Sequence, residues 1–557
     1  MFGWISDRFS TTGETQGALA SARSARALIA RLETESPQYA MDELAKQFHA
    51  APREALCTPN GLRALQLLDE WAQPALTKLW DSLLADTHGQ TVRAAAWGTL
   101  TRYYRRSFLA YWNSVGPSAG TEAPKAQTTE SLSAVRSMAA LHRYILLQRT
   151  NYLAIAEDSW THVWRLMSWA EQQQMAATAP YPHCAATTIE REFLISLLIE
   201  VAPTGNLLPG QILALDHLLH EHADHYRKAD RYDAQSTPFS YQPARSEAPQ
   251  RHLQGLKIHD GMRFFGPGSA NAQICAARDA AHALRNPPQW LAQAGCSVEA
   301  YVELLDRLAA HWAPDPPRRR HPRESCSGEI LVAHDLPTIR RLVKFSELAL
   351  SGQSLSYDAE NIYKVKDTVR TNGDAVNSAF SRVVTPKEAL ANLVTFEKSL
   401  PSDATEAWQL NDSSESGVGA SAQPDCPWVK VGMVVAFRLR DSVDWQVALV
   451  RRLSRNPQSP LCIGLARLGD KARSARLRRG IGAVDYAKCT GEIEYDAIIL
   501  KAATSSLLLP VGVFDQTQKY TLTCENRQQV VKMEKSLERR PNFECVQISE
   551  VEMLRAA

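Results

Sequence analysis

The spacing of apolar residues changes along the chain, and this change limits the possible folds more than any other feature. Up to about residue 312, apolar residues recur at steps of three and four, as in Leu65–Leu84, which is the spacing of amphipathic helices. From Ala407 onward, short runs rich in β-branched and apolar residues, such as Val429–Leu439, are separated by polar or glycine breaks, as in a series of short strands. Because one hydrophobic core seldom organises 557 residues, the pattern predicts a multidomain α+β protein.

The same pattern divides the chain into three predicted parts. Residues 1–312 form a mainly α-helical region, and a segment without periodicity at 230–251, rich in Pro, Ser and Gln, would split it into two subdomains. Residues 316–470 form an antiparallel β-barrel that is interrupted by a helical insertion at about 336–402. Residues 484–557 form a further β-rich unit at the C-terminus.

Charge and cysteine content argue against several classes of protein. The 62 Lys and Arg residues nearly balance the 60 Asp and Glu residues, which leaves a net charge of +2, so we do not expect the whole surface to bind nucleic acid or membrane. None of the ten cysteines falls in a Cys-x-x-Cys pair, so no zinc knuckle is expected. The apolar windows are too short for a membrane span. Without a signal peptide at Met1, a reducing, cytoplasmic setting is expected.

A cluster of arginines precedes a strand-like run that begins near Ser325. Pro322 keeps this segment from being helical. Guanidinium groups bind phosphate oxygens in bidentate fashion, and they also match the O6/N7 acceptor edge of guanine. The segment therefore predicts an anion site, and the alternative is a solvent-exposed basic linker. The arginines are Arg318, Arg319, Arg320 and Arg323.

A second polar fragment, Asp412–Gly417, follows another predicted strand. Asp412 could accept hydrogen bonds from the N1–H and N2–H groups of guanine, and Ser414 could donate to a phosphate or to a base acceptor. Gly417 would let the chain turn with a positive φ and approach a ligand closely. Together with the arginines, these groups suit a phosphorylated guanine compound. The alternative is an ordinary Asx-type turn between strands.

The two fragments resemble the RxxxR and [D/N]xSxxG motifs of the PilZ family of cyclic di-GMP receptors. The run Ile463-Gly464-Leu465 also looks like part of a PilZ barrel. The resemblance covers about residues 316–470. It implies a bacterial, cytoplasmic signalling receptor whose PilZ-like β-barrel binds cyclic di-GMP without a cofactor and without catalysis. Arg319 and Arg323 match the first motif, and Asp412, Ser414 and Gly417 match the second, with Arg318 and Arg320 as further candidates.

The sequence departs from the PilZ pattern in the distance between the two motifs. Family members separate the motifs by little more than one strand and its turn, whereas here the helical insertion at 336–402 lies between them. Such an insertion is tolerable, because each doubling of loop length costs only about 0.6 kcal/mol in closure entropy. Four cations on the insertion could reach a phosphate or could form solvated faces: Arg340, Arg341, Lys364 and Lys366.

Two other clusters remain open to more than one interpretation. Histidines with neighbouring carboxylates on one predicted helix could bind a divalent metal or form a polar face; the HExxH arrangement is absent, and we assign no metal site. These are His217, His220, His222 and His225. A basic stretch after the predicted barrel could contact nucleic acid or form a solvated loop between two β units. It comprises Arg467, Lys471, Arg473, Arg476, Arg478 and Arg479.

The sequence as a whole favours a non-catalytic effector that binds cyclic di-GMP. It contains no GxxxxGK[ST] phosphate loop and no GxSxG nucleophile elbow. Arg319 and Arg323 would clamp the phosphates and the guanine acceptor edges, Asp412 would recognise the guanine donors, and the N-terminal helices would contact a protein partner. One alternative is a degenerate PilZ-like scaffold that binds proteins without nucleotide. The other is a nucleic-acid-binding protein, which the balanced charge disfavours.

Overall fold

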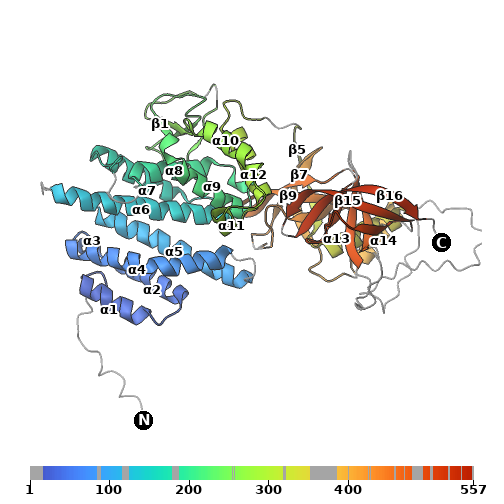
Figure 1. The fold of residues 1–557 in the computed structure, drawn as a ribbon, viewed down its shortest axis with the longest axis horizontal. Coiled ribbons are helices and arrows are strands. Elements are labelled where there is room, and N and C mark those ends of the chain that lie inside the picture. Colours follow the sequence, from blue (N-terminus) through green and yellow to red (C-terminus); the bar gives the residue numbers. More distant parts are fainter. Residues whose placement is uncertain are drawn as a thin grey trace, which may run out of the picture. The chain divides into compact units, whose positions relative to one another are not determined.

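The chain forms two compact units, Met1–Arg318 and Arg319–Ala557. Figure 1 shows helices over most of the first unit and mainly strands in the second, so the predicted α+β organisation is confirmed. Among the described residues, no helix combines the length and the apolar character needed to cross a membrane. The computed structural model describes residues 17–84, 89–115, 124–178, 187–253, 255, 257–317, 321–351, 385–398, 400–424, 426, 428–456, 459–469, 471–479, 494–501, 506–524, 527–540 and 542–554.

The first unit begins with helices that share one apolar core. They are α1 (Ala22–Leu32), α2 (Pro37–Ala50), α3 (Arg53–Leu56), α4 (Pro59–Leu84) and α5 (Gln90–Ser114). The hydroxyls of Ser21 and Ser36 cap α1 and α2 by accepting hydrogen bonds from backbone N–H groups of the first turn. Leu28, Leu65 and Leu100 lie in this core, and Leu65 begins the stretch whose three- and four-residue spacing predicts a helix.

More helices and a small sheet complete the first unit. The segment 230–251, predicted to divide two subdomains, supplies β2 (Phe239–Tyr241) and β3 (Gln250–Arg251) to a four-stranded antiparallel sheet of order β1-β4-β2-β3. Phe239 is fully buried, and this burial orders a segment whose composition is typical of a linker. The other strands are β1 (Arg227–Ala229) and β4 (Arg263–Gly266). The helices are α6 (Pro124–Thr150), α7 (Glu157–Gln172), α8 (Ile189–Val201), α9 (Pro209–Glu221), α10 (Ala270–Ala281), α11 (Gln289–Gln293) and α12 (Val298–Trp312), with short turns η1 (Thr204–Asn206) and η2 (Ala223–His225).

The second unit begins with the predicted barrel, which is closed, six-stranded and antiparallel in the order β10-β7-β6-β5-β8-β9. Alternate residues face its interior, so that Ile330 and Val332 of β5 are fully buried. We call this barrel the first barrel. Its strands are β5 (Glu324–Ala333), β6 (Glu406–Ser414), β7 (Gly417–Ala422), β8 (Val434–Leu439), β9 (Gln446–Asn456) and β10 (Ser459–Arg467).

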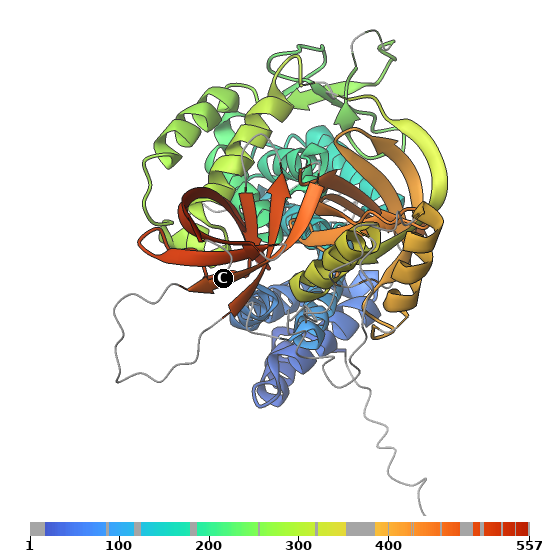
Figure 2. The ribbon, with the colours of Figure 1, turned by 90° about the vertical axis from the view of Figure 1, so that its right-hand side faces the viewer.

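A second closed barrel follows, in the order β11-β12-β13-β16-β15-β14. Its strands are drawn from orange-red to dark red in Figure 2. Its first strand is β11 (Lys471–Arg479), so the interpretation of this basic stretch as a solvated loop is wrong. Ala475 and Leu477 of β11 are buried in the barrel core, and the C-terminal β-rich unit, expected over 484–557, therefore includes a strand before residue 484. The other strands are β12 (Glu494–Lys501), β13 (Ser506–Leu509), β14 (Lys519–Cys524), β15 (Arg527–Arg540) and β16 (Phe543–Leu554).

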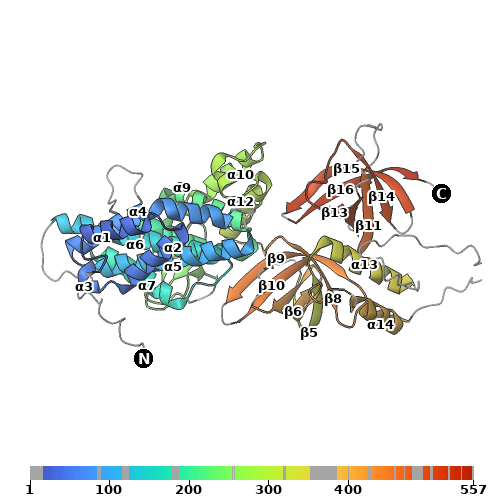
Figure 3. The same ribbon diagram turned by 90° about the horizontal axis from the view of Figure 1, so that it is seen from below.

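The helical insertion joins the two barrels. Its helices are α13 (Leu336–Ser351) and α14 (Pro386–Glu397), and residues 352–384 lie outside the described residues. Figure 3 shows α13 between the barrels. Ile339 of α13 shares a buried core with Val434 of the first barrel and Leu500 of the second. The insertion therefore contributes to the hydrophobic core of the unit.

Candidate functional site

Strand order brings the two predicted motifs together at one end of the first barrel. β5 pairs antiparallel with β6, and Ser325 lies opposite Asp412. β6 and β7 form a tight hairpin in which Ser414 lies opposite Gly417. Because antiparallel neighbours run in opposite directions, the start of β5 lies beside the end of β6. Arg323, which directly precedes β5, therefore lies beside the Asp412–Gly417 hairpin.

Arg323 and Asp412 are in direct contact across 89 positions of sequence. Arg323 Nη1 donates to Asp412 Oδ2 at 3.0 Å and lies 2.9 Å from Oδ1. The two side chains are 33% and 27% exposed, so solvent reaches the pair. A second contact between the same two segments joins His321 Nδ1 to Glu415 Oε2 at 2.9 Å. One predicted residue from each motif, Arg323 and Asp412, thus lies in direct contact; Arg318, Arg319 and Arg320 lie outside the described residues.

Asp412 retains capacity for a further hydrogen bond. Its Oδ1 atom is shielded from solvent and accepts no hydrogen bond from the described part of the chain, although it contributes to the ion pair with Arg323. The carboxylate lies over Gly419 of β7, where an added Cβ would meet Oδ2 at 2.6 Å. Gly419 thus provides the space for this carboxylate, and no motif in the sequence marks it.

Ser414 and Gly417 close the hairpin, although Gly417 does so differently from the prediction. Ser414 Oγ donates to the carbonyl oxygen of Gly417 at 3.1 Å. The prediction of a positive φ at Gly417 is wrong, because the residues with positive φ do not include it. A Cβ at this position would instead lie 2.1 Å from the carbonyl oxygen of Leu465 in β10. Close approach of two strands therefore requires glycine here.

Arg467 also belongs to this site, which the sequence did not indicate. It ends β10, and its Nη1 donates to the carbonyl oxygens of Ser414 and Glu415, at 2.9 Å for Glu415. Its Nε donates to Gln446 Oε1 at 2.8 Å. Burial lowers the pKa of Arg467 from its usual value, but an arginine stays charged at neutral pH. The sequence marked Arg467 only as part of a basic stretch with Lys471–Arg479, because its contacts here depend on the register between β7 and β10.

Of the cations predicted on the insertion, Arg340 does not lie at this site but contacts the second barrel. Arg340 is buried rather than solvated, and its Nε lies 2.5 Å from Asp496 Oδ1 of the second barrel. Lys364 and Lys366 lie outside the described residues. Arg340 therefore helps to hold α13 against the second barrel, so its interpretation as part of a solvated face is wrong.

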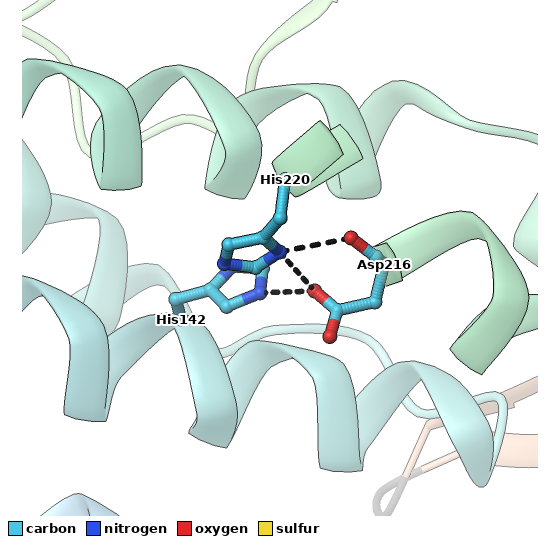
Figure 4. A group of neighbouring side chains, drawn as sticks. All are labelled: His142, Asp216 and His220. Carbon is cyan, nitrogen blue, oxygen red and sulfur yellow. Dashed lines mark hydrogen bonds and ion pairs between the residues drawn. The ribbon is translucent and has the colours of Figure 1, made fainter. Parts of the chain in front are cut away.

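The histidine-rich helix contributes to a separate cluster in the first unit (Figure 4). His142 of α6 joins Asp216 and His220 of α9, and their potential ligand atoms lie within 4.8 Å of one another. His142 Nε2 lies 2.6 Å from Asp216 Oδ1, Arg143 Nη1 donates to Oδ2 at 2.9 Å, and His220 Nδ1 lies 2.8 Å from the Asp216 carbonyl oxygen. His217, by contrast, stacks on Trp290 with ring centroids 4.2 Å apart.

Charge balance favours an ion-pair network at this cluster over a metal site. Burial alone would raise the pKa of Asp216, but Arg143 and His142 outweigh burial and hold this pKa well below its usual range. Burial likewise opposes protonation of His220, yet its hydrogen bond to Asp216 and the charges of Asp216 and Glu192 raise its pKa to about 9. A metal at this cluster would therefore have to displace a proton from His220. The carboxylate of Asp216 is therefore already satisfied by its protein partners.

One comparison with known proteins finds a similarity in the helical part of the chain. Residues 23–229 match the family model described as the N-terminal domain of the cyclic-di-GMP receptor FimW. Comparisons with curated proteins and with solved structures gave no match. The matched residues lie in the first unit, whereas the motifs that indicated a cyclic-di-GMP receptor lie at or beyond its C-terminal boundary. The N-terminal helices of this chain are thus similar to the N-terminal domain of that receptor family.

Proposed function

We propose that this protein is a non-catalytic cytoplasmic receptor that binds cyclic di-GMP at the end of a PilZ-like first barrel. The contact between Arg323 and Asp412 carries this proposal, because it unites two motifs that are 89 positions apart. The match of the N-terminal helices to a cyclic-di-GMP receptor family supports it independently.

The side chains at this site suit both the phosphates and the guanine bases of cyclic di-GMP. The Arg323 guanidinium can bind a phosphate or the O6/N7 edge of guanine. Asp412 Oδ1 is an acceptor without a hydrogen bond among the described residues, and it suits the N1–H and N2–H donors of guanine. Ser414 and Gly417 shape the hairpin that carries Asp412, and we assign Arg319, with Arg318 and Arg320 beside it, to the phosphates.

Ligand binding would replace the ion pair between Arg323 and Asp412. Each side chain of this pair is about a third exposed, and such pairs contribute only about 0–1 kcal/mol. A hydrogen bond between a charged protein group and the ligand contributes about 1.5–3 kcal/mol. The exchange is therefore favourable, and the pair keeps both groups oriented until ligand arrives.

The insertion offers a route from the binding site to the rest of the second unit. β5 follows the arginine segment directly and leads into α13, and α13 shares its core with both barrels. The ligand can shift this arrangement only by the difference in its affinity for the two states. The N-terminal helices would then supply the surface for a protein partner.

The decisive experiment is calorimetric titration of the full chain with cyclic di-GMP. We expect saturable binding that Arg323→Ala and Asp412→Ala each weaken by about 1.5–3 kcal/mol. Arg440→Ala is the matched control, because Arg440 forms an ion pair with Glu329 on the same barrel at 2.9 Å. It should leave affinity unchanged. No binding by the folded wild-type chain at high micromolar ligand would refute the receptor function and favour a scaffold that binds only proteins.

A further inference from the structure

The Arg467 guanidinium bonds to fixed protein acceptors around the hairpin that joins β6 and β7. Nη1 donates to the carbonyl oxygens of Ser414 and Glu415, and Nη2 lies 3.5 Å from Ser413 Oγ. Nε donates to Gln446 Oε1 at 2.8 Å. The side chain of this one residue thus links β10 to β9 and to the hairpin.

The backbone of Arg467 reinforces the same link. Its N–H donates to the carbonyl oxygen of Ser416 at 3.0 Å. Three successive carbonyl groups of the hairpin, from Ser414 to Ser416, therefore accept hydrogen bonds from Arg467. These carbonyls belong to residues 414–416, which follow Asp412 in the hairpin. Loss of the guanidinium would therefore make this part of the hairpin more mobile.

We infer that Arg467 is a positioning residue of the nucleotide site, which holds the Asp412–Gly417 hairpin in its binding conformation without contacting the ligand itself. This inference rests on the proposed function. A hairpin that samples several conformations binds more weakly, because only the fraction in the competent conformation accepts the ligand. The planar fork of arginine suits this task, since a lysine ammonium is a single point of charge and cannot reproduce the fork geometry.

The test compares Arg467→Gln with Arg455→Gln in the full chain. Arg455 is a matched control because its Nη2 also donates to backbone carbonyls, those of Cys426 and Val429 between β7 and β8, at 3.2 and 3.0 Å. Well below the melting temperature of each variant, Arg467→Gln should weaken cyclic di-GMP binding about tenfold, the equivalent of one net hydrogen bond. Arg455→Gln should leave affinity unchanged, and Arg467→Lys should recover only part of the loss.

Salt dependence separates positioning from direct contact. Salt screens the attraction between a guanidinium and a phosphate, so Arg323→Gln should make the affinity less dependent on salt. Arg467→Gln should weaken binding while its salt dependence stays that of the wild type. A flattened salt dependence in Arg467→Gln would show direct ligand contact and overturn the positioning role.

Hydrogen exchange tests the positioning role of Arg467 separately from the binding of cyclic di-GMP. Without ligand, Arg467→Gln should accelerate amide exchange in peptides that cover 411–421, whereas Arg455→Gln should not. If the wild type binds cyclic di-GMP but Arg467→Gln changes neither affinity nor exchange, only the positioning role fails. If the wild type does not bind, the receptor function fails, and unchanged exchange in Arg467→Gln would remove the positioning role as well.

Discussion

The buried ion pair that attaches α14 to the first barrel allows a quantitative prediction about the insertion. Arg438 and Glu397 have side chains that are 1% and 10% exposed. Arg438 Nε donates to Glu397 Oε1 at 2.7 Å, and Nη2 donates to Oε2 at 2.5 Å. Nη1 donates to three carbonyl oxygens, those of Leu439, Arg440 and Ser442. We predict that Arg438→Met destabilises the attachment of α14 to the barrel.

The size of the expected loss in stability follows from the burial of the charged side chain that remains. Removing one member of a buried pair leaves an uncompensated charge, which costs about 3–5 kcal/mol. Glu397→Met should cost a similar amount, because it leaves the Arg438 guanidinium without a counterion. The double variant should cost clearly less than the sum of the two, since neither charge is then left alone.

Native-state hydrogen exchange of the full chain measures this loss locally. Amides in Pro386–Glu397 should exchange faster by about tenfold for each 1.4 kcal/mol lost, while amides in the first unit keep their wild-type rates. Additive costs in the double variant, or a loss below about 1 kcal/mol in either single variant, would contradict the assignment of a tightly coupled buried pair.

Two further predictions concern single glycines and pH. Gly417→Ala should lower the stability of the second unit by about 1–3 kcal/mol in denaturation experiments, because the new Cβ would lie 2.1 Å from the Leu465 carbonyl oxygen. Gly419→Ala should cost less stability yet weaken cyclic di-GMP binding, since its Cβ meets only the movable Asp412 carboxylate; the opposite order of stabilities would contradict this geometry. The pKa of His220 rises from 6.5 to about 9 on folding, so its stabilising contribution is complete below about pH 6.5 and is lost as pH rises through about 9. The difference in melting temperature between wild type and His220→Gln should therefore shrink as pH rises from neutral to alkaline, and a difference that grows would refute the charge assignment.

Local sequence was sufficient to predict secondary structure wherever that structure depends on the residues of one segment. The three- and four-residue spacing of Leu65–Leu84 predicts α4, because a helix buries the face that its own period defines. The short apolar runs after Ala407 likewise predict strands, and most of them belong to the barrels. Arg323 and Asp412 were found as a pair because each lies in a motif of recognisable chemistry.

Other features depend on contacts that local sequence does not encode. The basic run Lys471–Arg479 has the composition of a solvated loop, but pairing with β12 and β14 makes it a strand of the second barrel. The segment 230–251 has the composition of a linker, yet burial of Phe239 orders part of it as sheet. In both cases tertiary burial overrides local preference.

The sequence alone therefore determined the helical and strand-rich halves of this protein, the two polar motifs and the presence of an insertion between them. Only the tertiary structure decided that the insertion helix α13 shares its core with two barrels, that Gly417 faces the backbone of β10 and that Arg467 supports the hairpin. The physical reason is that periodicity and motif chemistry act within short segments. Strand register and burial, by contrast, are set by residues that are far apart in the chain.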